Sequence, residues 1–225
     1  MGKVFIESET THNPITAIGK YAGICWGTDT SNLIKNYKRG LECLSNNHGR
    51  TLEFPQIYIV LEDYSARVIR ELYTHIGGMP TRLQESTRYI NEENFDYVIP
   101  KSIENNPSAL ETYKDVMDTI STGYHCLLDL GISKEDSANL LPLGMHSKVV
   151  FRTNLRHLIE MSQTRLCTRA YWEFRELIKD IMTELSKYDE EYALIIEKYF
   201  KPICEIRGYC IEKYSCGKMP MKDNL

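Results

Sequence analysis

Residues 64–89 read YSARVIRELYTHIGGMPTRLQESTRY, a helical pattern followed by a polar segment. Ser65 is typical of a helix N-cap, and Val68, Ile69 and Leu72 form an apolar stripe at helical spacing. The glycine pair at 77–78 and the proline at 80 predict that the helix ends there. The pattern therefore predicts an amphipathic helix that leads directly into a polar loop.

That loop, residues 81–89, combines guanidinium, amide, carboxylate and hydroxyl side chains. Guanidinium forks, hydroxyl groups and loop N–H groups are the donors that an anionic ligand needs. A solvated loop between two core elements explains the same composition, because polar loops are common on protein surfaces. On this segment alone, both interpretations stay open.

The length and net charge of the chain limit the classes of protein to which it can belong. The chain has 225 residues and a net charge of −4, and it shows no repeat and no linker. We expect one domain over 1–225 with a cysteine-containing tail at about 201–225. This charge gives no sign of non-specific binding to nucleic acid or anionic membrane, and no apolar run approaches the roughly 20 residues of a membrane span. Seven cysteines without an export signal favour reduced thiols and a cytoplasmic protein.

Hydrophobic periodicity predicts both strands and helices along the rest of the chain. Ser133 begins a motif that resembles a capping box and opens a further short helix. The long helix at 108–130 is expected to bury Leu110, Tyr113, Val116, Met117, Ile120, Tyr124, Leu127 and Leu128. Strands are predicted at 3–6, 56–62 and 148–151, and helices at about 15–26, 31–45, 108–130, 155–164, 168–187 and 189–200.

A second informative stretch is residues 154–173. Thr153 and Asn154 form an N-cap pair for the helix that follows. One face of this helix carries Leu155, Leu158, Ile159 and Ser162, and another carries Arg156, Glu160 and Gln163. A salt-bridged surface between helices explains the polar face as well as a binding role does.

Four segments, in order over about residues 45–185, resemble the flavin-dependent thymidylate synthase family. The family signature is Arg-His-Arg, seven residues, then Ser-x-Arg-Tyr; residues 86–89 match its second half and His75 matches its central histidine. His48 and Glu53 match an upstream Gly-His-x-x-x-x-Glu segment. A later family segment is matched by Asn154, Arg156, Leu158, Arg165, Trp172 and Glu173.

The chain departs from the family pattern at three places. Thr74 and Ile76 replace the two arginines that flank the signature histidine, and the loop that follows is two residues longer. A family arginine of a later segment falls at Ala138. Two or three expected charges facing phosphate or flavin are therefore missing. The candidates for a substitute are Arg82, in the longer loop, and, more weakly, Arg50 and Lys148.

The resemblance implies an α+β fold, with a mixed or antiparallel sheet flanked by helices, and a homotetramer whose active sites are built from several subunits. It implies methylation of dUMP to dTMP, with methylenetetrahydrofolate as carbon donor and NADPH-reduced FAD as hydride source. Two alternatives stay open: a related flavin enzyme that acts on UMP or transfers hydroxymethyl, and a nucleotide-binding protein without catalysis. Bound flavin would distinguish an enzyme from the binding protein.

Carried over residue by residue, the resemblance assigns the site. Arg165 is expected at the pyrimidine carbonyls, and it shares the catalytic role with Ser86. The expected nucleotide-binding residues are Glu71, Gln84, Glu85, Ser86, Thr87, Arg88 and Arg165. The expected flavin-binding residues are His48, Thr51, Glu53, His75, Arg82, Asn154, Arg156 and Glu160.

The cysteines require a separate interpretation. Thymidylate can also be made by thiolate attack on C6, and a thiolate nucleophile needs an electropositive setting. Cys167 is the only cysteine flanked by arginines, Arg165 and Arg169, but the flavin family requires no enzyme nucleophile.

The tail holds three further cysteines, Cys204, Cys210 and Cys216, and no histidine. A structural zinc site usually has four ligands, often in close pairs. We therefore expect reduced thiols in the tail and no metal site.

Overall fold

The structure is a computed structural model that describes residues 2–90 and 94–222. Its sheet has four antiparallel strands in the order β1-β2-β4-β3, and helices make up most of the remaining elements, which confirms the α+β prediction. Their bounds are β1 (Lys3–Ile6), β2 (Gln56–Ser65), β3 (Thr81–Gln84) and β4 (His146–Asn154).

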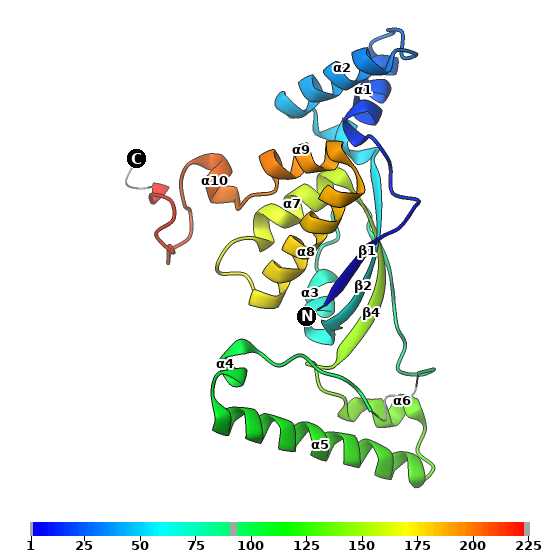
Figure 1. Cartoon of the computed structure of the whole chain (residues 1–225), viewed down its shortest axis with the longest axis vertical. Helices are drawn as coiled ribbons and strands as arrows, with labels where there is room; N and C mark the ends of the chain where they lie inside the picture. The colour runs from blue at the N-terminus through cyan, green and yellow to red at the C-terminus, as the bar shows by residue number, and fades with distance from the viewer. Residues whose placement is uncertain (1, 91–93, 223–225) are drawn as a thin grey trace. The chain divides into compact units, whose positions relative to one another are not determined.

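The helices lie close to their predicted positions, although α8 begins about four residues later than expected. Figure 1 labels each of them. The α-helices are α1 (Pro14–Cys25), α2 (Leu33–Ser45), α3 (Ala66–Leu72), α4 (Lys101–Glu104), α5 (Pro107–Asp129), α6 (Lys134–Ser137), α7 (Leu155–Arg165), α8 (Trp172–Tyr188), α9 (Glu190–Tyr199) and α10 (Ile203–Arg207). Two 3₁₀ turns, η1 (Gly49–Glu53) and η2 (Ala138–Leu140), complete the elements of the described residues.

The chain forms two compact units. The first comprises the described residues within 1–3, 61–74 and 82–150, and the second those within 4–60, 75–81 and 151–225. Strands β2 and β4 continue from one unit into the other. The expectation of one domain over 1–225 stays a prediction, and its residues 1, 91–93 and 223–225 lie outside the described part.

In the second unit, α1 and α2 pack closely as a helical hairpin (Figure 1). A Cβ at Gly19 would lie 1.8 Å from the carbonyl oxygen of Asn36, and one at Gly40 would lie 1.9 Å from that of Ile15. Real atoms do not approach so closely, so two glycines on facing helices are what let these backbones meet.

Helices α7 and α8 supply much of the core of the second unit. Leu155, Leu158, Ile159 and Ser162 are buried, which confirms the predicted apolar face of α7. Phe174 and Leu177 of α8 are fully buried as well. The polar face of α7 is thereby left on the surface, where the predicted site residues lie.

In the first unit, α3 begins as predicted. The Ser65 hydroxyl accepts a hydrogen bond of 3.1 Å from the N–H of Val68, and Val68, Ile69 and Leu72 are fully buried. The helix ends at Leu72, so His75 follows the helix and is not part of it. The cap at Ser133 is also confirmed, because its hydroxyl accepts from the N–H of Asp136 at 3.2 Å.

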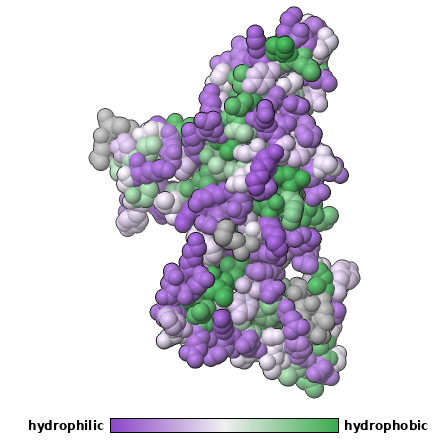
Figure 2. Space-filling model, viewed as in Figure 1, coloured by the Kyte–Doolittle hydropathy of each residue, from purple (hydrophilic) through white to green (hydrophobic). Residues whose placement is uncertain are grey.

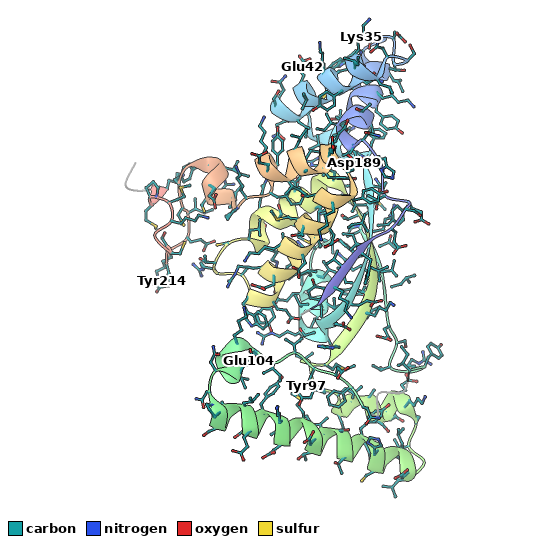
Figure 3. All side chains as sticks on the ribbon, viewed as in Figure 1. Lys35, Glu42, Tyr97, Glu104, Asp189 and Tyr214 are labelled. Atoms are coloured by element: carbon teal, nitrogen blue, oxygen red, sulfur yellow. The ribbon has the colours of Figure 1, made fainter. Side chains whose placement is uncertain are left out.

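Two expectations in the first unit were wrong. Residues 81–84 were assigned to a loop, but they form β3, because they pair with the edge of β4. Within the described part of the chain, Met117 and Tyr124 are the only side chains of α5 that are buried, and Val116 is 50% exposed. The other five residues of the predicted buried face are only partly covered, although Tyr97 packs its ring against Tyr113 of α5 (Figure 3).

Hydrophilic residues predominate on the face shown in Figure 2, with smaller hydrophobic patches between them. Among the described residues, no helix is both long and apolar enough to span a lipid bilayer.

Candidate flavin and nucleotide site

Five of the predicted flavin-binding residues of the second unit, His48, Thr51, Glu53, Arg156 and Glu160, lie in or next to η1 or on α7, two elements that contact each other. Arg156 Nη1 donates to Glu53 at 2.7 Å, and its Nε donates to Glu160 at 3.0 Å. The hydrogen bond to Glu160 is the main cause of the raised pKa of Arg156, and the hydrogen bond to Glu53 is the second. Three predicted residues from two segments thus form one exposed ion-pair cluster.

The 3₁₀ turn presents the other members of this group. The Thr51 hydroxyl donates to the carbonyl of His48 at 2.7 Å, which closes the turn. His48 is exposed, and its ring meets the edge of Trp26 with 6.3 Å between the centroids. Arg50 is exposed and makes no ion pair with any described residue, so its charge is available to a ligand.

His75 and Arg165 form the second contact of the predicted site. Arg165 Nε donates to His75 Nε2 at 2.8 Å, so this imidazole nitrogen carries the lone pair. The Arg165 guanidinium carbon also lies 4.5 Å from the centre of the Phe174 ring, a cation–π distance. The histidine and the aromatic ring together fix the orientation of the arginine.

The Asn154 side chain makes two hydrogen bonds within the protein, and its expected flavin-binding role stays a prediction. Its Oδ1 accepts from the N–H of His157 at 2.9 Å, which caps α7, and its Nδ2 donates to the carbonyl of Gly78 at 3.2 Å. The residue is 6% exposed. Both ends of its amide therefore hold the glycine loop against the start of α7.

The predicted phosphate loop lies in the first unit. Gln84 donates to Ser147 at 2.9 Å, and the Glu85 N–H donates to the Lys148 carbonyl at 2.8 Å, which extends the pairing of β3 with β4. Beyond them, the N–H groups of Tyr89 and Ile90 both bond to the Ser86 carbonyl. The chain therefore turns sharply at Ser86, Thr87 and Arg88.

Arg88, Lys148 and Glu71 are further charged candidates of the first unit. Arg88 is exposed and pairs with Glu135 at 3.2 Å, a contact between two side chains that are each about 60% exposed. Lys148 pairs with Glu62, which raises its pKa and weakens its case as a substitute cation. Glu71 lies on α3 in the same unit, where its carbonyl accepts from the Thr74 hydroxyl at 2.7 Å.

Arg82, the proposed substitute for the missing arginines, lies on β3. Its guanidinium carbon is 5.1 Å from the centre of the Tyr73 ring. Burial lowers the pKa of Arg82, although a guanidinium remains charged at neutral pH. Sequence reasoning missed Tyr73, and also Phe174, because both rings are recognisable as site residues only once the arginines stack on them.

The predicted residues thus divide between the two units. Flavin residues His48, Thr51, Glu53, His75, Asn154, Arg156 and Glu160 belong to the second unit, and Arg82 to the first. The nucleotide residues 71 and 84–88 belong to the first unit, and Arg165 to the second.

Comparison with known proteins decides the family. The sequence profile described as "Thymidylate synthase complementing protein" matches residues 8–189. A flavin-dependent thymidylate synthase from Pyrococcus abyssi is 34% identical over 174 residues, which cover 76% of this chain and 70% of the relative. The chain belongs to the flavin-dependent thymidylate synthase family.

Two other members of this family match most of the chain, one in sequence and one in fold. The enzyme from Nitratidesulfovibrio vulgaris is 27% identical over 213 residues, which cover 89% of this chain and 84% of the relative. Thymidylate synthase X from Helicobacter pylori, solved with FAD and dUMP, superimposes with a TM-score of 0.68 at 16% identity. That match covers 89% of this chain and 100% of the other, and it confirms the flavin-dependent thymidylate synthase fold.

Proposed function

We propose that this chain methylates C5 of dUMP to give dTMP, with FAD as hydride carrier, methylenetetrahydrofolate as carbon donor and NADPH as reductant. The contact between Arg165 and His75 carries the proposal. It joins two family positions that are 90 residues apart in the sequence, at 2.8 Å. The family match over residues 8–189 supports the same reaction.

The chemistry of the side chains in the second unit fits a flavin nucleotide. FAD presents two phosphates and a ring with hydrogen-bonding groups, which call for cations and for polar donors. Arg50 supplies an exposed cation, and the half-exposed guanidinium of Arg156 supplies another, shared with two carboxylates. His48 adds an exposed imidazole. These residues would hold FAD, which supplies the hydride.

Arg165 would act on the pyrimidine. A guanidinium at the ring carbonyls stabilises the negative charge that develops when C5 becomes nucleophilic. Because His75 and Phe174 fix its orientation in advance, the arginine would need little reorganisation during the reaction. Cys167 has no place in this scheme, and its neighbour Arg169 is paired with Glu212 at 2.8 Å.

The turn at residues 86–88 would hold the 5′-phosphate of dUMP. The Ser86 hydroxyl and the side chain of Arg88 are the expected donors. The ion pair of Arg88 with Glu135 is largely exposed, and such pairs contribute only about 0–1 kcal/mol, so a phosphate can replace the carboxylate at little cost.

We also propose a homotetramer. The α5 helix supports it, because 23 residues of helix bury only two side chains among the described residues, while Val116 stays exposed. An apolar face left partly uncovered is typical of a subunit interface. Light scattering of the purified protein would give the mass of the assembly directly.

The decisive experiment is product analysis of purified protein incubated with dUMP, FAD, methylenetetrahydrofolate and NADPH. We expect dTMP, identified by mass and chromatography, and its loss in Arg165→Ala. Hydroxymethylated product, or turnover of UMP in place of dUMP, would support the related flavin enzyme instead. Bound nucleotide with neither flavin binding nor product would support the binding protein.

A further inference from the structure

Four of the seven cysteines border one cavity of about 420 Å³ in the second unit. Cys167 follows α7, Cys204 lies on α10, and Cys210 and Cys216 lie in the segment beyond α10. Figure 3 shows this segment, in which Tyr214 is labelled and also borders the cavity. The family reaction as proposed above uses none of these thiols.

The four thiols differ in access and in chemistry. Cys216 is exposed, whereas Cys204 and Cys167 are half-buried and Cys210 is buried. A hydrogen bond with Thr168 lowers the pKa of Cys216, and the N–H and the positive charge of Lys218 lower it further. Burial raises the pKa of Cys204, and the neighbouring Cys210 and Cys167 raise it too.

Lys218 interacts electrostatically with both the exposed Cys216 and the half-buried Cys204. It pairs with Glu205, next to Cys204, and this pair is the main cause of its raised pKa, to which Cys204 and Cys216 add. The positive charge of Lys218 favours the thiolate of Cys216, which is the reactive form.

The segment that carries Cys216 is held by surface contacts. Glu212 pairs with Arg169 through side chains that are each about 46–47% exposed, and Cys210 forms a bridge with Met221. The ion pair is exposed and contributes little to stability, whereas the N–H of Cys210 donates to the Pro220 carbonyl at 2.7 Å and holds the two ends of the segment together. Among residues 2–90 and 94–222, no three His, Cys, Asp or Glu side chains are grouped closely enough to ligate one metal ion.

We propose that Cys216 and Cys204 form a thiol–disulfide exchange site for low-molecular-weight disulfides such as glutathione disulfide. The Cys216 thiolate attacks the disulfide, forms a mixed disulfide and releases one glutathione thiolate. The Cys204 thiolate then attacks Cys216 Sγ, forms the Cys204–Cys216 disulfide and releases the second glutathione. The two cysteines are oxidised and the small disulfide is reduced to two thiols. This site is independent of the proposed thymidylate chemistry.

The test uses the full-length protein, treated with glutathione disulfide near neutral pH, quenched with acid and mapped by peptide mass spectrometry. We expect a linked peptide pair that contains Cys204 and Cys216. Cys204→Ser should stop at glutathione on Cys216, and Cys216→Ser should leave Cys204 largely reduced. Cys25→Ser, which removes an exposed thiol outside the cavity, is the matched control and should behave as wild type.

Labelling rates provide a second measurement. Under limiting maleimide, Cys216 should react at least about threefold faster than the exposed Cys25 and Cys126 near neutral pH, because more of it is thiolate. Equal rates, stable glutathione on Cys216 in wild type, or a link from Cys216 to Cys167 or Cys210 would overturn the assignment. So would one equivalent of zinc that protects all four thiols.

Discussion

Arg165 Nε donates a hydrogen bond to Nε2 of His75 at 2.8 Å, and the ring of Phe174 lies under the same guanidinium at 4.5 Å. The arginine is therefore held by an acceptor on one side and an aromatic face on the other. His75 therefore orients the arginine that is proposed to act on the pyrimidine.

His75→Ala should lower kcat for dTMP formation about tenfold to a hundredfold, because a hydrogen bond to a charged group contributes about 1.5–3 kcal/mol. His75→Gln should recover much of the loss, since its Oε1 can accept from Arg165 Nε. Steady-state kinetics of both variants, with FAD binding measured in parallel, is the check. If Gln fails as badly as Ala, the imidazole has a role other than orienting Arg165.

Arg82→Ala should weaken binding of dUMP or FAD by roughly ten- to a hundredfold if Arg82 replaces a missing arginine. Arg82→Lys should recover only part, because an ammonium lacks the guanidinium fork. Isothermal titration with each ligand is the measurement, and Arg88→Ala is the reference variant. If Arg82→Ala binds both ligands with unchanged affinity while Arg88→Ala binds dUMP more weakly, Arg82 does not replace a missing arginine and only packs against Tyr73.

Gly78→Ala should destabilise the fold by more than Gly27→Ala does. Both glycines have positive φ, +69° and +63°, for which a side chain costs about 1–2 kcal/mol. At Gly78 the new Cβ would also lie 2.6 Å from Asn154 Nδ2, whereas at Gly27 it meets nothing within 4 Å. Urea unfolding gives the free energy of unfolding of each variant, and the difference between the two losses measures the cost of the steric clash at Gly78. Equal losses would mean that the loop at residues 77–78 moves to accommodate the new Cβ.

Asn154→Ala should destabilise the protein by about 1–3 kcal/mol, because it removes a helix cap and leaves a polar group at Gly78 without its donor. Asn154→Asp keeps the acceptor for the His157 N–H, so it should lose only the contact with Gly78. Thermal unfolding measures both changes. A stability close to wild type in Asn154→Ala, combined with weak FAD binding, would contradict this prediction and support the expected flavin-binding role of the amide.

Cys167→Ala should retain dTMP formation, because the flavin chemistry requires no enzyme thiolate. The kinetic assay is informative only if folding and FAD binding are unchanged. A loss of more than about a hundredfold in kcat under those conditions would indicate covalent catalysis by Cys167.

Local signals predicted much of this fold. Ser65, Ser133 and Asn154 cap helices where the sequence placed them, because a cap bonds within three residues of itself. The buried face of α7 also followed from spacing alone. The strand at residues 81–84 was missed, because four mostly polar residues carry no strand signal of their own and pair only where β4 offers an edge.

Contacts distant in sequence were beyond such reasoning. Spacing identified Arg82 and Arg165 as candidates, but nothing local indicates that Tyr73 and Phe174 lie beneath them. The contact of the Asn154 amide with the carbonyl of Gly78 was likewise not predictable, and the flavin role of Asn154 stays a prediction. In the tail, three cysteines were weighed alone, because Cys167 joins them only through the folding of the segment after α10.

The path of the chain limits how this protein can be divided into fragments that each contain one unit. It crosses between its two compact units at residues 3–4, 60–61, 74–75, 81–82 and 150–151, and two of these crossings lie inside β2 and β4. No single cut releases either unit whole, and any gene fragment that encodes all of one unit also encodes part of the other. Exchange of one unit for that of another protein would have to replace three separate segments of the chain at once.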